Sequence, residues 1–201
     1  MNYLLICNVL QVNSEPLSVN YTMQFKNLTE RRTNDAQFIE TPNDVYILSV
    51  SKISVRKLPC DVFDFQHRVN NLILNQCGIQ AIKEECFSQQ LQNVDHINLA
   101  DNELKVIQTG TFIHIGVVSI NLQNNFITRI EDNAFANLSN LRDVLLSSNH
   151  LQKFNSGAFT HTPKLVNLNV DRNRIKSLQE KFLAFLESNT LLILDFQRNN
   201  I

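Results

Sequence analysis

The side chains that could carry chemistry in this chain include five histidines and four cysteines. The histidines are His67, His96, His114, His150 and His161. No pair of them has the i, i+4 spacing of a metal site, and none lies at a short zinc-ligand spacing from a cysteine. The patterns G-x-S-x-G and H-E-x-x-H and a Gly-rich phosphate loop are also absent from the sequence. We therefore predict that the chain is not an enzyme and uses no metal or cofactor.

Apolar residues recur far more regularly than the reactive ones, in the pattern L-x-x-L-x-L-x-x-N-x-L-x-x-L. The N of this pattern, the marker position, falls at residues 53, 77, 102, 125, 149, 173 and 199, with spacings of 23 to 26 residues. Ile53 and Cys77 occupy the first two markers, and asparagine occupies the others: Asn102, Asn125, Asn149, Asn173 and Asn199. We expect these asparagines to form a structural ladder, because their amides can pair with backbone groups that each turn leaves unpaired.

A phenylalanine follows ten residues after the marker in five successive repeats. These residues are Phe63, Phe87, Phe112, Phe135 and Phe159. In the next repeat Phe182 comes one place early. We predict that the rings stack as a column within the core, on the side opposite the strands, and do not form an aromatic binding site.

Each x-L-x-L-x segment has the period of a strand, so its leucines point inward and its x residues outward. The outward residues form three columns, which we interpret as a surface that contacts a partner. The predicted contacts are Asn71, Ile73, His96, Asn98, Asn121, Gln123, Asp143, Leu145, Asn167, Asn169, Asp171 and Asp195. The alternative is that these residues are only solvated and bind nothing.

The outward face is rich in amides and largely neutral. Its acidity is confined to Asp143, Asp171 and Asp195, with Arg172 and Arg198 beside them. Hydrogen bonding with a few apolar contacts suits a protein partner, whereas a polyanion would need a basic surface. We therefore expect a protein ligand and no nucleic acid.

Over residues 45–201 this repeat resembles the extracellular "typical" leucine-rich-repeat family. The resemblance implies an α/β fold, a right-handed horseshoe solenoid of about seven repeats with short parallel strands on its concave face. No turn can bury its leucines alone, so neighbouring turns must stack.

Two segments add a narrower resemblance: Arg56-Lys57-Leu58-Pro59 before a Phe-containing turn, and Val69-Asn70-Asn71-Leu72-Ile73-Leu74-Asn75. With the strand-like segment 21–25 before them, they are similar to the secreted leucine-rich-repeat immune proteins of mosquitoes. That family implies a role in innate immunity and a complement-like protein partner. The chain has neither the Cys-rich region nor the coiled coil of the long family members, so dimerisation through those parts does not carry over. The alternatives are an ectodomain fragment of a Toll-like or adhesion receptor and a structural extracellular matrix protein.

Three cysteines fall within the repeats, namely Cys60, Cys77 and Cys86. Cys77 stands at a marker position, so we expect a buried thiol there. Cys60 and Cys86 belong to neighbouring turns, which stack about 4.8 Å apart, and are therefore candidates for a disulfide. The alternative is that all three remain thiols.

The segment before the repeats has two parts. Residues 1–14 contain a short apolar run, Leu4–Leu10, which we interpret as a signal peptide. Residues 15–44 are more polar and contain strand and turn signals, so we expect an N-terminal β cap over the first turn. Sequons at Asn20, Asn27 and Asn137 predict glycosylation and an extracellular location.

The last repeat contains Leu191, Leu194, Phe196 and Ile201 with no cap after it. We expect either a longer gene product or a second chain, identical or different, that covers this end. The chain has a formal net charge of −1 and 18% charged residues, which exclude a disordered polyelectrolyte. No stretch approaches the roughly 18 apolar residues of a membrane span.

Overall fold

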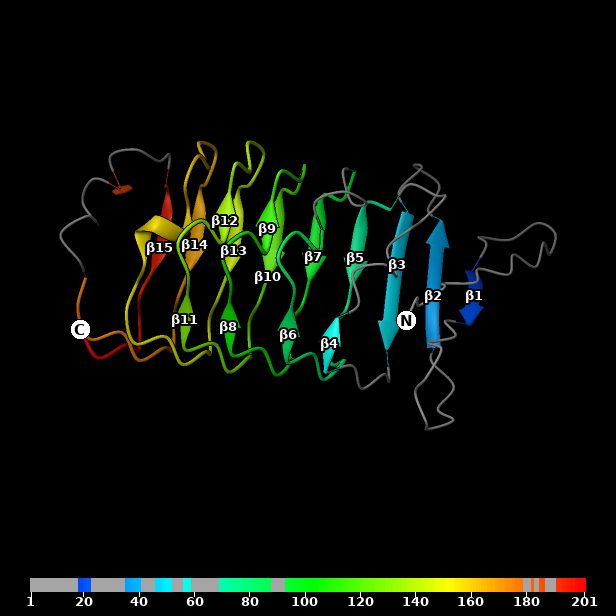
Figure 1. The fold of residues 1–201 in the computed structure, drawn as a ribbon, viewed down its shortest axis with the longest axis horizontal. Coiled ribbons are helices and arrows are strands. Elements are labelled where there is room, and N and C mark those ends of the chain that lie inside the picture. Colours follow the sequence, from blue (N-terminus) through cyan, green and yellow to red (C-terminus); the bar gives the residue numbers. More distant parts are fainter. Residues whose placement is uncertain are drawn as a thin grey trace.

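The computed structural model describes residues 56–58, 69–87, 93–178, 182, 185–186 and 191–201, and the backbone of three strands within residues 18–51. Phe63, Cys60, Asn27 and the proposed signal peptide lie outside the described residues. The described turns stack along one axis from the amino-terminal strands to Ile201 (Figure 1).

One sheet of nine strands runs the length of the molecule (Figure 1). In spatial order the strands are β1 (Ser18–Thr22), β2 (Asp35–Glu40), β3 (Tyr46–Ser51), β5 (Asn71–Ile73), β7 (His96–Asn98), β10 (Ser119–Asn121), β13 (Asp143–Leu145), β14 (Asn167–Asn169) and β15 (Ile193–Asp195). The strands β1, β2 and β3 pair antiparallel, and every pairing from β3 to β15 is parallel. The predicted solenoid with one short parallel strand per turn is therefore confirmed.

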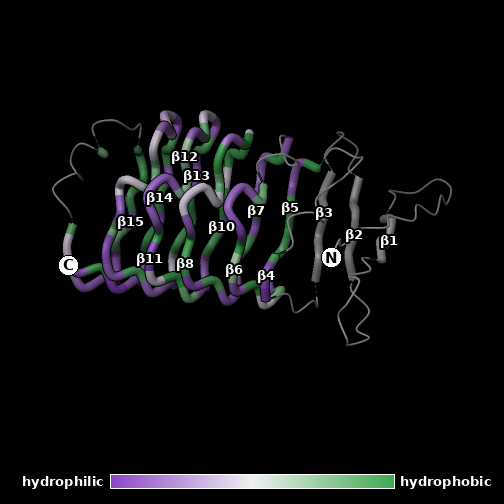
Figure 2. The backbone as a smooth tube through the Cα atoms, in the orientation of Figure 1, coloured by the Kyte–Doolittle hydropathy of each residue, from purple (hydrophilic) through white to green (hydrophobic). Residues whose placement is uncertain are grey.

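Three pairs of two-residue strands connect successive turns elsewhere around the solenoid. They are β4 (Lys57–Leu58) with β6 (Ala81–Ile82), β8 (Val106–Ile107) with β11 (Arg129–Ile130), and β9 (Phe112–Ile113) with β12 (Phe135–Ala136). A 3-10 turn, η2 (Ser156–Ala158), follows in the next repeat. Hydropathy alternates within each turn, because one side of the chain faces the interior and the other faces solvent (Figure 2).

The interior is filled by the apolar positions of the repeat. On the strands Leu72, Ile97, Ile120, Val144 and Leu168 are at most 1% exposed. These residues are register partners on successive strands, so each turn buries its central strand residue against the next turn. Stacking thus supplies the burial that no single turn achieves.

The predicted phenylalanine column runs through the core. Phe87, Phe112, Phe135 and Phe159 stack with ring centroids 5.1 to 5.3 Å apart and planes within 6° of parallel. The next turn departs from this order, because Phe185 lies against Phe159 at 5.7 Å. Phe182, the residue predicted for this place, instead contacts Phe154 edge-on at 5.5 Å.

In each turn from β5 to β15, a left-handed residue lies three positions after the end of the strand, directly before the marker position. These residues are Gln76, Asp101, Asn124, Ser148, Arg172 and Arg198, with φ between 50 and 57°. The conformation turns the chain sharply away from the sheet, and only glycine adopts it without a steric cost. The strand ends are therefore fixed by the surrounding hydrogen bonds rather than by flexible residues. Among the described residues no helix reaches the length and apolarity of a membrane span.

Candidate functional site

The outward side of the parallel strands, which we call the concave face, has the first and middle predicted columns in register. Asn71, His96, Ser119, Asp143 and Asn167 are successive partners in the first column. The middle column pairs Ile73, Asn98, Asn121, Leu145, Asn169 and Asp195 in the same way. The structure thus brings the sequence-predicted contact residues of β5 to β15 onto one surface.

The polar residues of the middle column are held by their own turns. The Oδ1 atoms of Asn98, Asn121 and Asn169 accept hydrogen bonds from the backbone N–H two residues later, at 2.9 to 3.0 Å. Asp195 does the same for Gln197 at 2.9 Å. Each side chain therefore caps its strand end, and the Nδ2 group of each asparagine is oriented as a hydrogen-bond donor at the surface. This role was not predicted from the sequence, although an Asn or Asp as the last residue of a strand is its signal.

Asp171 is more enclosed than a partner-contact residue should be. It is 6% exposed, and its Oδ2 atom lies 3.2 Å from Arg172 Nη2 and 3.6 Å from Arg198 Nη1. Arg172 is fixed further by a 2.9 Å hydrogen bond from its Nε to Ser148 Oγ. The other carboxylate oxygen, Oδ1, is buried without a hydrogen-bond partner in the structure. The aspartate therefore anchors two arginines from neighbouring turns.

The first column has polar contacts between its strands. Asn167 Nδ2 donates to Asp143 Oδ1 at 3.2 Å. Asn71 Oδ1 is buried and has no hydrogen-bond partner, whereas the neighbouring His96 is exposed. The half-buried Ile73 and Leu145 provide the apolar part of the face. The concave face is thus an ordered polar surface with two apolar positions.

The marker asparagines lie inside the turns and do not reach the concave face. Asn125 is representative: its Oδ1 accepts from Leu104 N–H at 3.0 Å, and its Nδ2 donates to Leu99 O at 3.0 Å and Leu122 O at 3.1 Å. Asn102, Asn149, Asn173 and Asn199 bond backbone groups of their own and the preceding turn in the same way. Each amide therefore links two turns through buried backbone groups.

The cysteines divide into one buried thiol and one disulfide. Cys77 is a buried thiol, and burial raises its pKa to about 11. Cys86 is disulfide-bonded, which contradicts the alternative in which all three repeat cysteines stay reduced. Its partner lies outside the described residues, where the predicted partner Cys60 also lies.

We expect Cys77 to resist alkylation in the native protein and to react after unfolding. At mildly alkaline pH its raised pKa keeps the thiol protonated, and the thiolate is the reactive form. Mass spectrometry of peptides after iodoacetamide treatment, with and without denaturant, measures the reaction. Labelling of the Cys77 peptide at equal rates in both conditions would contradict the burial of this residue.

Of the three sequons, only the one at Asn137 has described side chains. Asn137 and Ser139 are both exposed, while the intervening Leu138 is buried. Asn137 has a φ of 56° and its N–H is bonded to Thr160 O at 2.9 Å, so the residue protrudes from a fixed turn. The acceptor side chain is thus accessible, and glycosylation there remains a prediction.

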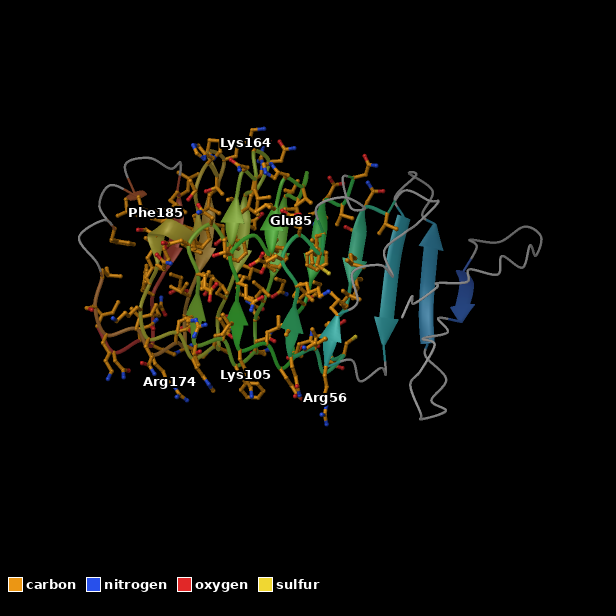
Figure 3. The ribbon with its side chains drawn as sticks, viewed as in Figure 1. Arg56, Glu85, Lys105, Lys164, Arg174 and Phe185 are labelled. Atoms are coloured by element: carbon orange, nitrogen blue, oxygen red, sulfur yellow. The ribbon has the colours of Figure 1, made fainter. Side chains whose placement is uncertain are left out.

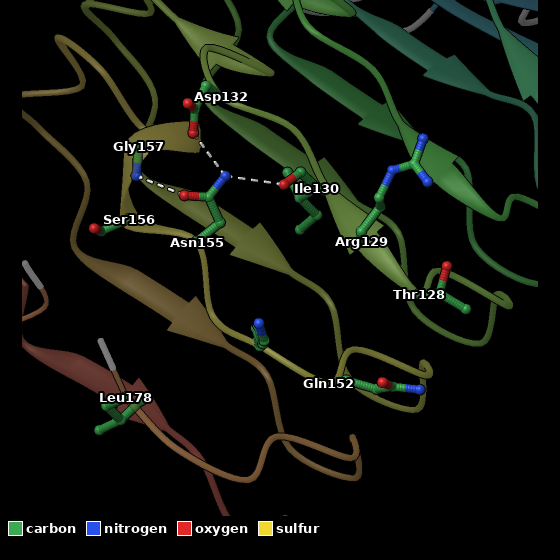
Figure 4. Close-up of a pocket in the computed structure, with 10 residues that line it drawn as sticks. Thr128, Arg129, Ile130, Asp132, Gln152, Asn155, Ser156, Gly157 and Leu178 are labelled. Carbon is green, nitrogen blue, oxygen red and sulfur yellow. Dashed lines mark hydrogen bonds between the residues drawn. The ribbon is translucent and has the colours of Figure 1, made fainter. Parts of the chain in front are cut away.

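A groove of about 920 Å³ lies away from the concave face, across three successive turns (Figure 4). Its lining includes Thr128, Arg129, Gln152, Lys153 and Leu178. Asn155 organises one wall, because its Nδ2 donates to Asp132 Oδ1 at 2.9 Å and to Ile130 O at 3.0 Å, and its Oδ1 accepts from Gly157 N–H at 3.1 Å. The repeat pattern did not identify this groove.

Most titratable groups of the described residues are dispersed over the surface. Among the residues that the structure describes, no three His, Cys, Asp or Glu side chains are grouped as a metal site would require. Hydrogen bonds from the Thr109 N–H and the Arg129 guanidinium lower the pKa of Glu131, which keeps this surface carboxylate ionised.

Together the stacked turns, the asparagine ladder and the strand register define a leucine-rich-repeat protein. The family model "Leucine rich repeat" matches residues 67–119 and 115–175, more than half of the chain. The chain belongs to this family. Its members and its fold typically serve as non-enzymatic protein-interaction modules.

Comparison with individual proteins agrees. The chain is 31% identical to Toll-like receptor 8 of Homo sapiens over 144 residues, which are 72% of this chain and 12% of the receptor. It is 28% identical to keratocan of Gallus gallus over 131 residues, 62% of this chain and 36% of keratocan. The solved leucine-rich-repeat domain of APL1 superposes with a TM-score of 0.63 at 21% identity, covering 76% of this chain and 39% of that domain. This chain thus spans a minor part of each of these proteins.

Proposed function

We propose that this protein is an extracellular, non-catalytic module that binds a protein partner through its concave face. The observation that carries the proposal is the ordered arrangement of that face over six parallel strands, β5 to β15. The strand-end hydrogen bonds fix Asn98, Asn121 and Asn169, so they present their amides to a partner at little entropic cost. Ile73 and Leu145 add apolar contacts between them.

The finer parts of the proposal concern location and partner. Residues 1–14 would serve as a signal peptide, residues 15–44 as the cap and residues 45–201 as the repeats. Export would permit glycosylation at Asn20, Asn27 and Asn137, and a disulfide between Cys60 and Cys86. The exposure of Asn137 and the bonded state of Cys86 support an oxidising, extracellular environment.

The proposed setting is innate immunity, with a complement-like protein as the partner. The sequence resemblance to secreted mosquito immune proteins supports this setting, and so does the similarity to Toll-like receptor 8. The exposed Leu192 and Ile193 on and beside β15, 83% and 55% accessible, also support association with another chain through this strand.

A second candidate is the ectodomain of a Toll-like or adhesion receptor. The match to Toll-like receptor 8, which covers 72% of this chain and 12% of the receptor, supports it. A structural matrix protein is the third, supported by the match to keratocan. Localisation of the native protein to a membrane fraction, to extracellular fluid or to insoluble matrix separates the three.

We expect two arginines placed on the concave face to abolish partner binding. Ser119→Arg and Gln123→Arg, on and beside β10, insert charge at the centre of the face and form no part of the core. Capture from extracellular fluid with the wild-type protein as bait, followed by quantitative mass spectrometry, measures the loss.

The matched control carries Asn93→Arg and Gln108→Arg, two exposed positions outside the three columns. It adds the same charge and should retain the partner. Equal retention by both variants would show that binding uses another surface. Identification of a complement-like protein among the specifically lost partners would support the immune proposal.

A further inference from the structure

A second surface lies where the chain turns away from the ends of the strands. Five exposed cations gather there on the last three turns, and we call them the basic edge: Lys153, Arg172, Arg174, Lys176 and Arg198. Figure 3 shows Arg174 pointing outward along this edge, and Lys105 pointing the same way three turns earlier. The basic edge adjoins the concave face at Asp171, whose carboxylate contacts Arg172 and Arg198, while its other three cations lie outside the three columns.

Backbone hydrogen bonds place the cations of the basic edge on adjoining turns. Arg174 N–H donates to Leu151 O at 2.8 Å, and Asn200 N–H donates to Ile175 O at 2.9 Å. Lys176 N–H is bonded to Gln152 O, the residue before Lys153, at 3.4 Å. Turns linked in this way stack about 4.8 Å apart, so the charges form a short, closely spaced row.

The positive charge of this edge is largely uncompensated. We consider the segment that runs from the residue before each marker to the fourth residue after it. In four turns this segment contains no Asp or Glu: residues 124–129, 148–153, 172–177 and 198–201. Asp171 is the one carboxylate paired with the row among the described ion pairs, and it holds Arg172 and Arg198 together. The whole chain has a net charge of −1, so this row is a local segregation of charge.

The groove described above adjoins the basic edge, because Lys153 belongs to both. Its walls offer hydroxyl and amide groups from Thr128, Gln152 and Ser156, the Asp132 carboxylate, which accepts a hydrogen bond from Asn155 Nδ2, and the apolar Leu178, which is 38% exposed (Figure 4). Leu178 stands five residues after its marker, where the equivalent Ile107 and Ile130 are buried. A pyranose ring matches this combination, since it presents hydroxyl groups at its rim and C–H groups on its face.

We propose that the basic edge and the adjoining groove bind a sulfated polysaccharide. Sulfate groups along the chain pair with the guanidinium and ammonium groups of the row, and an intervening sugar ring occupies the groove. Guanidinium groups bind tetrahedral oxyanions through paired hydrogen bonds, and the shared contact with Asp171 orders Arg172 and Arg198 for this purpose.

Other anionic partners fit less well. A protein partner is the less favoured occupant, because the site offers mainly cations and a single exposed apolar side chain, Leu178, in the adjoining groove. A single-stranded nucleic acid would need aromatic faces for its bases. The nearest exposed ring, Phe126, stands two turns before Arg174 and meets the ring of His150 edge-on at 5.7 Å.

The test measures binding of heparin oligosaccharides to the full chain by calorimetry at physiological salt. In the test variant Lys153→Gln, Arg174→Gln and Lys176→Gln remove three exposed charges and leave the Asp171 cluster in place. The matched control carries Lys83→Gln, Arg142→Gln and Lys164→Gln, which remove the same charge from exposed positions elsewhere. We expect the test variant to bind about tenfold more weakly or worse, with a shallower salt dependence, and the control to bind like the wild type.

Thermal unfolding of all three proteins shows that affinity and not folding has changed. Failure of the wild-type protein to bind heparin, or equal weakening in the control variant, would overturn the proposal. Competition experiments show which anionic polymer the site prefers. Desulfated heparin should not displace bound heparin. Competition by polyglutamate or single-stranded RNA at the same charge concentration as heparin would overturn the assignment to a polysaccharide. None of these outcomes depends on the concave face or on its protein partner.

Discussion

Replacing Phe135 with alanine should destabilise the protein by about 3–5 kcal/mol, the range for truncation of a buried aromatic side chain. Phe135 is fully buried between Phe112 and Phe159, with ring centroids 5.2 and 5.1 Å away. Removal of the Phe135 ring leaves a cavity in a central turn. It also separates the stacked rings before this position from the ring after it. Because each turn is stabilised only by its neighbours, the defect weakens both halves. Chemical denaturation of the purified protein measures the loss in free energy of unfolding.

Two further variants show whether the loss of stability comes from the cavity left by the buried ring. Phe135→Leu keeps most of the volume and should cost about 1.5 kcal/mol or less if the cavity dominates. Phe126→Ala removes the same ring from a position that is 48% exposed and should cost less than about 1 kcal/mol. Equal effects of Phe126→Ala and Phe135→Ala would contradict the assignment of the column to the core.

Strand register could be predicted from the sequence because it depends on a short and strict periodicity. A strand alternates its side chains every residue, and each x-L-x-L-x segment must place its leucines inside. Aligning the repeats on the marker therefore also aligns the strands, and the pairing of Ile120 with Val144 and Ile97 agrees with that alignment. The column of Phe87 to Phe159 follows from the same constancy of spacing.

Features that arise where the repeat changes length could not be predicted in this way. The sixth spacing is 26 residues, two to three longer than most others, and there Phe185 takes the place beside Phe159 that Phe182 was expected to fill. Leu178 in the same repeat is half-exposed although its pattern position is apolar. The groove beside Leu178 lies where the repeat changes length, and the repeat pattern therefore did not predict it.

Side-chain roles at the strand ends also needed the structure. An outward asparagine such as Asn121 was predicted as a partner contact from its direction alone, yet its Oδ1 is already used by Gln123 N–H. Asp171 was predicted as an acidic contact, and the two arginines enclose it. Direction along a strand follows from periodicity, whereas these hydrogen bonds depend on the left-handed turn that follows each strand.

Removing one amide of the asparagine ladder is the other change with a large expected effect. Asn125→Leu keeps the approximate size of the side chain but deprives Leu104 N–H and Leu99 O of their bonds to the amide. Each buried polar group left without a partner costs about 1–3 kcal/mol, so we expect a loss of about 2–4 kcal/mol. The melting temperature should fall by roughly 5–15 °C for a chain of this size, measured by circular dichroism.

The matched control is Asn140→Leu, a change of the same type at an exposed residue whose Oδ1 accepts one hydrogen bond from Lys164 Nζ. It should alter the free energy of unfolding by no more than about 0.5 kcal/mol. Partner binding tells whether Asn125 has a structural role or contacts the partner. Asn125 lies within the turn and is only 4% exposed, so we expect a structural role alone. Below its lowered melting temperature, the Asn125→Leu protein should therefore still bind whatever the concave face binds. An unchanged melting temperature would show that the backbone groups of this turn find other partners, and that the asparagine at the marker position is not needed to link it to the preceding turn.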